Sequence, residues 1–575
     1  MASLTQFLAT QPASLPTTKR PPRRHSQAKT NISCRANEEN DFRNQGSRLL
    51  AGRRDLIISI GGLYGAATGM NLSAVAAPIQ APDIAKCGPA EIPAGGTPTN
   101  CCPPAFNSAI VDFVPPPRGG ALRVRPAAHL VDGEYLEKYR KAVELMRALP
   151  ADDPRNFLQQ ANVHCAYCDG AYDQIGFPNL DLQVHNSWLF FPWHRFYLYF
   201  HERILGKLIG DDSFAIPFWN WDAPAGMQLP SLYTDKASSL YNPNRDPKHQ
   251  PPTTVDLDGN PNPTFTKDQL IQDNLKIMYR QMLSNGKTAN LFLGAPYRAG
   301  DQPSPGSGSI EQAPHGPVHI WTGNPANPNV EDMGNFYSAA RDPIFYAHHG
   351  NIDRLWTVWK NLGGKRRDFA DGDWLNASFL FYDENAQPVR VKVRDCLDME
   401  KLGYKYQDVE NPWLNSRPTP AKRLLRKKAP APAPAPAKEP AFPVTLEKPV
   451  RATVKREKKG RSKKEKDEEE EVLLVEGIEV EKNEFVKFDV YINSSEEQNV
   501  RPSAIEFAGS FVNLPHHHHH GKKGKVLKTN LRLGITDLLE DLKAEDDDSV
   551  VVTLVPKTPN GKKVKVGGLR IEFSS

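Results

Sequence analysis

Residues Asn335–Trp359 read NFYSAARDPIFYAHHGNIDRLWTVW. The run is apolar and compatible with a helix, and two adjacent histidines, His348 and His349, lie at its centre. Upstream, the cluster His315-Gly-Pro-Val-His319 places two imidazoles four residues apart, which is one side of a helix. Such a pair offers two nitrogen donors to one metal ion, and a histidine from a neighbouring helix would complete the site. We therefore expect the fold to be organised around metal-binding histidines.

The first 76 residues have the composition of targeting segments. Residues 1–35 are rich in Ser, Thr and basic residues, and no acidic residue precedes Glu38, which is typical of a transit peptide. Arg53-Arg54 then precede a short apolar run that leads to Ala74-Val-Ala76, as in a twin-arginine export signal. A membrane anchor is the alternative, but the run is short and rich in glycine for a bilayer span. The two halves together predict import into a chloroplast and transfer into the thylakoid lumen.

Without this segment the chain is almost neutral. Of the 72 basic and 67 acidic residues, 10 and 4 lie in residues 1–76, which leaves 62 and 63. The formal charge of +5 therefore belongs to the targeting segment. This balance favours no nucleic-acid partner, and we expect no integral membrane span. The sequence does not indicate an oligomeric state.

The cysteines beyond Cys34 suggest disulfides. Cys101 and Cys102 are adjacent and would be strained if they bonded to each other, so each is expected to have a distant partner. Two disulfides among four of the six cysteines would suit a compartment that permits them, and four cysteines allow three pairings. The alternative, six buried thiols, is weaker because the first three lie in Pro/Gly-rich sequence. The four expected to pair are Cys87, Cys101, Cys102 and Cys165.

Composition divides the remaining chain into three parts. Residues 77–415 are predicted to be mainly α with a loop-rich periphery, and residues 365–415 mix short strands and turns, among them Gly372–Leu375. Residues 416–443 alternate Ala and Pro, which favours an extended polyproline II linker open to proteases. Residues 444–575 contain recurring strand-like segments and are predicted to form an all-β sandwich or barrel-like domain.

Four strand-like segments carry the prediction for the C-terminal part. The charged run Lys455–Glu471 is interpreted as a solvated loop or edge, and His516–His520 as an exposed hairpin loop. The predicted strands are Phe485–Ile492, Ile505–Val512, Val550–Val555 and Leu569–Phe573.

Six histidines form two triplets with regular spacing. Neutral imidazole suits copper, zinc, iron and nickel. No Glu follows His315, so the HExxH motif of zinc hydrolases is absent, and neither triplet has an acidic residue at an obvious ligand spacing. Two sites of three nitrogens suit copper, which alternates between Cu(I) and Cu(II) and can share O2 between two ions. The triplets are His164, His185 and His194, and His315, His319 and His349.

These histidine motifs, together with three others, resemble the plant polyphenol oxidases, the catechol oxidases and tyrosinases. The other motifs are Asp373-Trp-Leu375, Tyr404-Lys-Tyr406 and Lys487-Phe-Asp-Val490. With the two-part targeting signal, the resemblance covers essentially the whole chain. It implies a four-helix-bundle catalytic domain with a dinuclear copper centre, in which the first triplet binds one copper ion and the second triplet binds the other.

The resemblance also separates ligands from supporting residues. The family places the last ligand four residues before an aspartate, here Asp353, so His349 is the implied ligand. His348 and His201 then become supporting residues in the surroundings of the copper ions.

Covalent links are implied as well. Cys168 matches the cysteine that bonds through its sulfur to a ring carbon of the second ligand, His185, and such a thioether would hold that imidazole in place. Cys396 is left as a buried thiol. The implied disulfides are Cys87–Cys102 and Cys101–Cys165.

Four further residues correspond to the substrate side of the family's site. Phe336 matches the aromatic gate over the second copper, and Glu311 matches a carboxylate that orients a water. Gly316 and Ile320 line the substrate entrance. Glu311 would need a polar partner to hold the water, and Gly316 has no side chain to offer.

The implied reaction is oxidation of o-diphenols to o-quinones, with O2 reduced to water. Its partners are small phenolic substrates, and the C-terminal domain would shield the copper site until the linker is cut. The alternatives are a tyrosinase with substantial monophenol hydroxylation, a haemocyanin-like O2 carrier, and a zinc-binding structural protein.

Overall fold

A computed structural model describes residues 77–104, 108–117, 119–259, 264–419, 440–494, 501–516 and 526–574. These residues belong to one compact unit, Ala74–Ser575. The expected targeting segment 1–76 and most of the expected linker lie outside the described residues. Within the described part of the chain, no helix combines the length and the apolar character that crossing a membrane requires.

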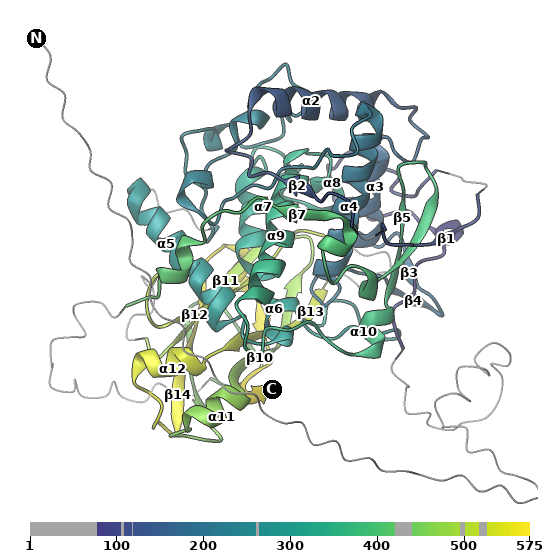
Figure 1. Cartoon of the computed structure of the whole chain (residues 1–575). Coiled ribbons are helices and arrows are strands. Elements are labelled where there is room, and N and C mark those ends of the chain that lie inside the picture. Colours follow the sequence, from purple (N-terminus) through teal and green to yellow (C-terminus); the bar gives the residue numbers. More distant parts are fainter. Residues whose placement is uncertain are drawn as a thin grey trace, which may run out of the picture. The chain divides into compact units, whose positions relative to one another are not determined.

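Helices form the core of the N-terminal part (Figure 1). The capping residues are of the expected types: Asp132 accepts from the N–H of Tyr135 at the start of α2, and Gly210 ends α4 in the left-handed conformation. A π-helical turn, Glu311–His315, leads directly into α7. The helices are α2 (Gly133–Ala148), α3 (Phe157–Cys168), α4 (Phe190–Ile209), α5 (Lys267–Tyr279), α6 (Ala289–Leu293), α7 (Gly316–Thr322), α8 (Phe336–Ala339), α9 (Ile344–Asn361) and α10 (Gly372–Asn376).

Helices α4 and α9 pack against each other at the centre of this part. Nearly every residue from Phe190 to Gly206 of α4 and from Ile344 to Trp356 of α9 is buried. A helix that is buried on all sides belongs to the interior of a large domain. The expected helical core is therefore confirmed, and the quoted stretch, Asn335–Trp359, lies within it as α8 and α9.

Asp353 of α9 holds four separate elements together. Its Oδ1 accepts from Nε of Arg195 on α4 at 2.5 Å, and its Oδ2 lies 3.2 Å from Nη1 of Arg125 on strand β2. The hydroxyls of Tyr404 and Tyr406 donate to the same Oδ2 at 2.7 and 2.6 Å. The carboxylate is buried and every charge around it is paired, which is the condition for a stable buried ion.

Small sheets surround the helices. Strand β2 (Arg123–Arg125) pairs in parallel with β7 (Tyr404–Tyr406), which brings the Tyr404-Lys-Tyr406 motif to Asp353. The segment Gly372–Leu375, expected among short strands and turns, instead belongs to the short helix α10. The other strands are β1 (Val111–Asp112), β5 (Ser378–Tyr382) and β6 (Pro388–Lys392) in one sheet, and β3 (Asp173–Gln174) and β4 (Phe177–Asp181) in another.

The C-terminal part is rich in β-sheet, as expected. One sheet has the order β13-β10-β15-β8 with β16 also paired to β10, and the other has the order β12-β11-β14-β9. Side chains from both sheets share a hydrophobic core separate from that of the helices. The strands are β8 (Val444–Thr445), β9 (Val450–Lys455), β10 (Glu470–Glu481), β11 (Val486–Ile492), β12 (Phe507–Asn513), β13 (Val526–Gly534), β14 (Ser549–Pro556), β15 (Lys565–Val566) and β16 (Gly568–Ser574).

Two features of this part differ from the prediction. Lys455–Glu471 is not a loop: it contains helix α11 (Lys463–Glu468), which begins with a capping box formed by Ser462 and Glu465. A further helix, α12 (Thr536–Leu542), follows β13. The high charge of Lys455–Glu471 favoured a loop in the prediction. The Ser-x-x-Glu spacing at the start of α11 is nevertheless typical of a helix N-terminus.

We predict that Asp353→Asn lowers the free energy of unfolding at pH 7 by about 3–5 kcal/mol, because it leaves the buried guanidinium of Arg195 without an anion and removes one of the two carboxylates that pair with Arg125. Burial alone would raise the pKa of Asp353, but Arg195 and Arg125 hold that pKa below its ordinary value. The stabilisation is therefore present above about pH 4, the pKa of an unfolded Asp, and is lost as the pH falls through the lower folded pKa.

Denaturant unfolding midpoints measured from pH 7 down to about pH 3 check this. The difference between wild type and variant should narrow at the acidic end. Asp371→Asn, which breaks an exposed pair with Arg298, is the control and should change stability by less than about 1 kcal/mol. Equal midpoints for wild type and Asp353→Asn at pH 7 would contradict the role given to Asp353.

Candidate metal centre

The structure brings the six predicted ligands together from different elements. His164 lies on α3, His194 on α4, and His185 in the segment that precedes α4. His315 ends the π-helical turn, His319 lies on α7 and His349 on α9. The two triplets face each other: the rings of His194 and His349 stack with centroids 4.2 Å apart, and those of His185 and His315 lie 6.1 Å apart. All six side chains are buried.

Backbone carbonyls determine the tautomer of four of these imidazoles. Nδ1 lies close to the carbonyl oxygen of Phe336 for His164 (2.9 Å), of Phe190 for His194 (2.8 Å), of Glu311 for His315 (3.1 Å) and of Met333 for His319 (2.7 Å). A carbonyl only accepts, so each Nδ1 carries the proton and each Nε2 is left with a lone pair. In metal sites the second ring nitrogen of a ligand histidine is oriented in the same way.

The other ring nitrogen of four of the six imidazoles has no partner within the described part of the protein. Among the described residues, Nε2 of His164, His185, His194 and His315 is buried and has no hydrogen-bond partner. Burial lowers the pKa of every one of the six histidines, to about 3 for His164 and about 4 for His319. Buried neutral imidazoles with orphaned lone pairs are costly unless a cation accepts them. The residues present therefore fit a dinuclear copper site.

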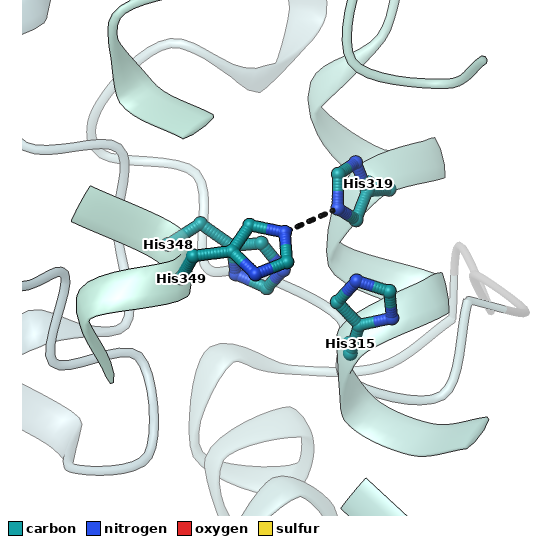
Figure 2. A group of neighbouring side chains, drawn as sticks. All are labelled: His315, His319, His348 and His349. Carbon is teal, nitrogen blue, oxygen red and sulfur yellow. Dashed lines mark hydrogen bonds between the residues drawn. The ribbon is translucent and has the colours of Figure 1, made fainter. Parts of the chain in front are cut away.

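His348 and His349 have different surroundings (Figure 2). Nε2 of His349 lies 3.3 Å from Nε2 of His319, across the space between α9 and α7. Nδ1 of His348 instead accepts from Nε1–H of Trp221 at 3.1 Å, and its ring stacks on that of His315. This geometry favours His349 as the metal ligand and His348 as its neighbour. Ring nitrogens of both residues nevertheless lie within 4.8 Å of ring nitrogens of His315 and His319.

His201, assigned as a supporting residue, packs between aromatic side chains. Its ring stacks on Tyr346 at 3.5 Å and lies edge-on to Phe157. Both of its ring nitrogens are buried, and burial lowers its pKa to about 3. These ring contacts are with Tyr346 of α9 and Phe157 of α3, so His201 contributes to the packing of α4 against these helices.

The cysteines lie where covalent links around the first triplet are possible. Cys168 is a buried thiol whose sulfur lies within 4.8 Å of ring nitrogens of His164 and His185. Cys396 is a second buried thiol near Arg195. The disulfides join Cys87 to Cys102 and Cys101 to Cys165, the same pairs that the resemblance implies.

Phe336 and Glu311 both lie against the histidines. The ring of Phe336 stacks on His185 with centroids 4.0 Å apart and lies edge-on to His164, so it packs on the first triplet and not, as the resemblance implies, over the second copper. Oε1 of Glu311 accepts from the N–H of Asn186 at 2.5 Å, while Oε2 is buried without a hydrogen-bond partner among the described residues. Burial raises the pKa of Glu311 well above its ordinary value. A carboxyl group in such a place can hold a proton near neutral pH.

The C-terminal domain closes directly over the predicted entrance. A methyl group placed on Gly316 would lie 2.8 Å from Cγ1 of Val512 on β12, so a larger residue would require Val512 to shift. Ile320, the other predicted entrance residue, is half-buried in α7. Leu514 extends further and joins the hydrophobic core of the helical part.

His516 is buried, which contradicts its assignment to an exposed loop. Its ring stacks on Phe336 with centroids 5.4 Å apart. The prediction rested on five consecutive polar side chains, and it failed at His516 because tertiary contact with Phe336 outweighs local polarity. Residues 517–520 of the same run lie outside the described residues.

Several residues around the site were not found from the sequence. Gln183 accepts from backbone N–H groups of Val184 and His185 and lies 3.3 Å from Nδ1 of His185. Trp221, which supports His348, lies 127 residues away along the chain. Val512 comes from a different domain. Separations of this kind leave no local pattern, and the one usable signal was the aromatic turn Ile216–Asp222 that contains Trp221.

Three known protein domains match consecutive parts of the chain. Residues 154–362 match the common central domain of tyrosinase. Residues 368–419 match the polyphenol oxidase middle domain, and residues 442–573 match the chloroplastic polyphenol oxidase C-terminal domain.

Relatives match over nearly the whole length. A chloroplastic polyphenol oxidase of Malus domestica is 57% identical over 559 residues, which covers 95% of this chain and 92% of the relative. Aureusidin synthase of Antirrhinum majus is 57% identical over 506 residues, covering 86% and 89%. Among solved structures, latent apple tyrosinase superimposes with a TM-score of 0.77 at 59% identity, covering 81% of this chain and all of that one.

We predict that His315→Ala lowers the bound copper from about two ions per chain to about one, because it removes one ligand of the second triplet and leaves the first intact. The measurement is elemental analysis of the folded protein after dialysis against a weak chelator. His129→Ala, a histidine outside the two triplets, is the control. Equal copper content in wild type and His315→Ala, or one zinc ion and no copper, would contradict the assignment.

Proposed function

Because the chain belongs to the plant polyphenol oxidase family, we propose that it oxidises o-diphenols to o-quinones and reduces O2 to water at a dinuclear copper centre. The observation that carries this proposal is the pair of facing, buried histidine triplets whose free nitrogens point inward. The first copper ion would be held by His164, His185 and His194, and the second by His315, His319 and His349.

The protein's own groups would prepare the centre for this reaction. Copper, when bound, supplies the O2 chemistry and accepts the two electrons of the diphenol. The carbonyls that hold the Nδ1 protons fix the imidazole orientations before any ion arrives. A thioether between Cys168 and His185 would add a covalent restraint on the imidazole that has a side-chain amide, rather than a carbonyl, at Nδ1.

Phe336 and Glu311 would control the substrate. Phe336, stacked on His185, acts as the aromatic gate against which a phenol ring packs. The unpartnered Oε2 of Glu311 would hold a water or a proton near the centre. Gly316 offers no side chain to fix that water as a base, so diphenol oxidation is expected to dominate over monophenol hydroxylation, with Ile320 shaping the entrance.

We assign the remaining parts of the chain in the same way. Residues 1–76 would be the plastid and thylakoid-lumen targeting segment, and relatives are named as chloroplastic. Residues 77–415 would form the catalytic domain, with α3, α4, α7 and α9 as its four-helix bundle, and residues 416–443 the linker. Residues 444–575 would form the domain that keeps the enzyme latent.

Latency is supported by the contacts of β12 with the entrance. The N–H of Val512 donates to Oε1 of Gln312 at 2.5 Å, and the N–H of Phe336 donates to the carbonyl of Pro515 at 3.3 Å. Lys487 forms buried ion pairs with Asp258 of the catalytic part, at 2.8 Å, and with Asp489. A phenol cannot pack on Phe336 while His516 covers it, so the closed form should be inactive until the C-terminal domain moves or is removed.

We predict that O2 uptake with catechol exceeds that with tyramine at least about tenfold, a difference of about 1.4 kcal/mol in activation free energy. The physical reason is the absence of a side chain at Gly316 to hold a base water. An oxygen electrode checks the initial rates, and a lag is expected with tyramine alone. Equal or faster uptake with tyramine, without a lag, would show that monophenol hydroxylation is a main activity.

We predict that cutting the chain between residues 417 and 443 raises the catechol rate, and that Val512→Phe partly mimics the cut. A larger side chain over Gly316 overpacks the closed form by about 1–3 kcal/mol, which favours the open form by up to about a hundredfold. Rates are measured before and after limited proteolysis and removal of the C-terminal domain.

The separated catalytic domains of wild type and variant are chemically identical, so their rates must agree and only the uncut rates should differ. Val526→Phe, an exposed position at the start of β13, is the matched control and should leave the uncut rate unchanged. If neither the cut nor Val512→Phe raises the rate, the C-terminal domain does not make the enzyme latent.

A further inference from the structure

A cavity of about 650 Å³ lies beside α8, and none of the histidines of the metal centre lines it. Its walls come from the N-terminal arm, the end of α2, the start of α3, the loops 238–244 and 327–332, and α8. The helix α8 separates it from the metal centre: Phe336 stacks on His185, while the next residue, Tyr337, lines the cavity. The volume is that of a site for a small organic molecule.

The carboxylates in this cavity are already satisfied by neutral donors. Oδ2 of Asp332 accepts from Nδ2 of Asn242 at 2.7 Å and of Asn244 at 3.0 Å. Oε1 of Glu331 accepts from the hydroxyl of Tyr337 at 2.9 Å. Burial also raises the pKa of Asp332, which weakens it as a local negative charge. Neither carboxylate forms an ion pair with an arginine of the cavity.

Two arginines of the cavity form no direct ion pair within the described part of the chain. Among the described residues, Arg147 and Arg341 have no carboxylate within 4.0 Å. Both guanidinium groups are held in place by aromatic rings: that of Arg147 lies 4.0 Å from the ring centroid of Phe157, and that of Arg341 lies 5.2 Å from that of Tyr337. Arg341 also donates to the hydroxyl of Thr99. Stacking leaves the N–H edges of a guanidinium available for a planar anion.

An apolar surface lies in the same cavity. Leu158, at the start of α3, is 54% exposed although it is a large aliphatic residue. Pro243 and Pro328 also line the cavity. An inorganic anion would use the arginines but would leave this surface in water, whereas an aromatic acid would cover it.

We propose that this cavity is a binding site for a small aromatic carboxylic acid, whose carboxylate pairs with Arg147 and Arg341 and whose ring packs on Leu158. The site is independent of the copper chemistry proposed above, because none of the six candidate copper-binding histidines lines it. Binding is reversible and involves no covalent step.

Isothermal titration calorimetry of the full-length, copper-loaded protein with benzoate tests the site. Arg147→Gln and Arg341→Gln should each raise the dissociation constant of one class of benzoate-binding sites at least about tenfold, because each removes a charge-assisted hydrogen bond. Arg394→Gln is the matched control: it too has no carboxylate partner among the described residues, but it lies outside the cavity and bonds to Leu375 and Asn376. Leu158→Ser should weaken benzoate binding, although it leaves the charge of the cavity unchanged.

Three comparisons decide the outcome. Benzyl alcohol, the neutral analogue, and inorganic phosphate should both bind far more weakly than benzoate. Benzoate density beside Arg341 in crystals of the same protein, absent in the double variant Arg147→Gln/Arg341→Gln, would locate the site. Unchanged benzoate affinity in that folded double variant, density only at the histidines, or equal affinity for benzyl alcohol would overturn the proposal. None of these readouts depends on catechol oxidation, so the proposed function and this site can fail separately.

Discussion

The buried carboxylate of Asp353 is the interaction on which the two halves of the metal centre depend. It lies one helical turn beyond His349, and its partner Arg195 directly follows His194. The ion pair therefore fixes the register of α4 against α9, and with it the distance between one ligand of each triplet. Arg125, Tyr404 and Tyr406 bind the same carboxylate from the parallel strands β2 and β7. A shift of one helix along the other would leave buried charges unpaired, which costs several kcal/mol.

Hydrogen bonds between the imidazoles and backbone carbonyls explain how the centre can exist in a hydrophobic core. Every backbone carbonyl that receives an Nδ1 proton gains a partner and at the same time directs Nε2 inward. Burial keeps the imidazoles neutral, which is the form that binds a metal ion. The buried Nε2 atoms that have no hydrogen-bond partner among the described residues would be stabilised by a bound cation.

A few residues at the end of β12 attach the C-terminal domain to the helical part. β12 belongs to a separate sandwich with its own core, yet Leu514 and His516 beyond its end pack on the helical part. Gly316 lies directly beneath β12, because a Cβ atom there would lie 2.8 Å from Cγ1 of Val512. The residue that the family resemblance assigns to the substrate entrance is therefore also the residue beneath the covering strand.

The sequence by itself determined the histidine triplets, the helices that carry them, the cysteine pairs to consider and the sheet-rich C-terminal part. These follow from local spacing: imidazoles four apart share a helix face, alternation predicts strands, and motifs such as Tyr404-Lys-Tyr406 identify the family. Local spacing was less successful where charge or polarity hid the pattern, as in α11 and at His516. Only the tertiary structure decided that Trp221 supports His348, that Asp353 joins four elements, that Val512 covers Gly316 and that two unpaired arginines share a cavity. Each of these contacts joins residues far apart in the chain, and their energies depend on burial and partner geometry, which no local pattern encodes.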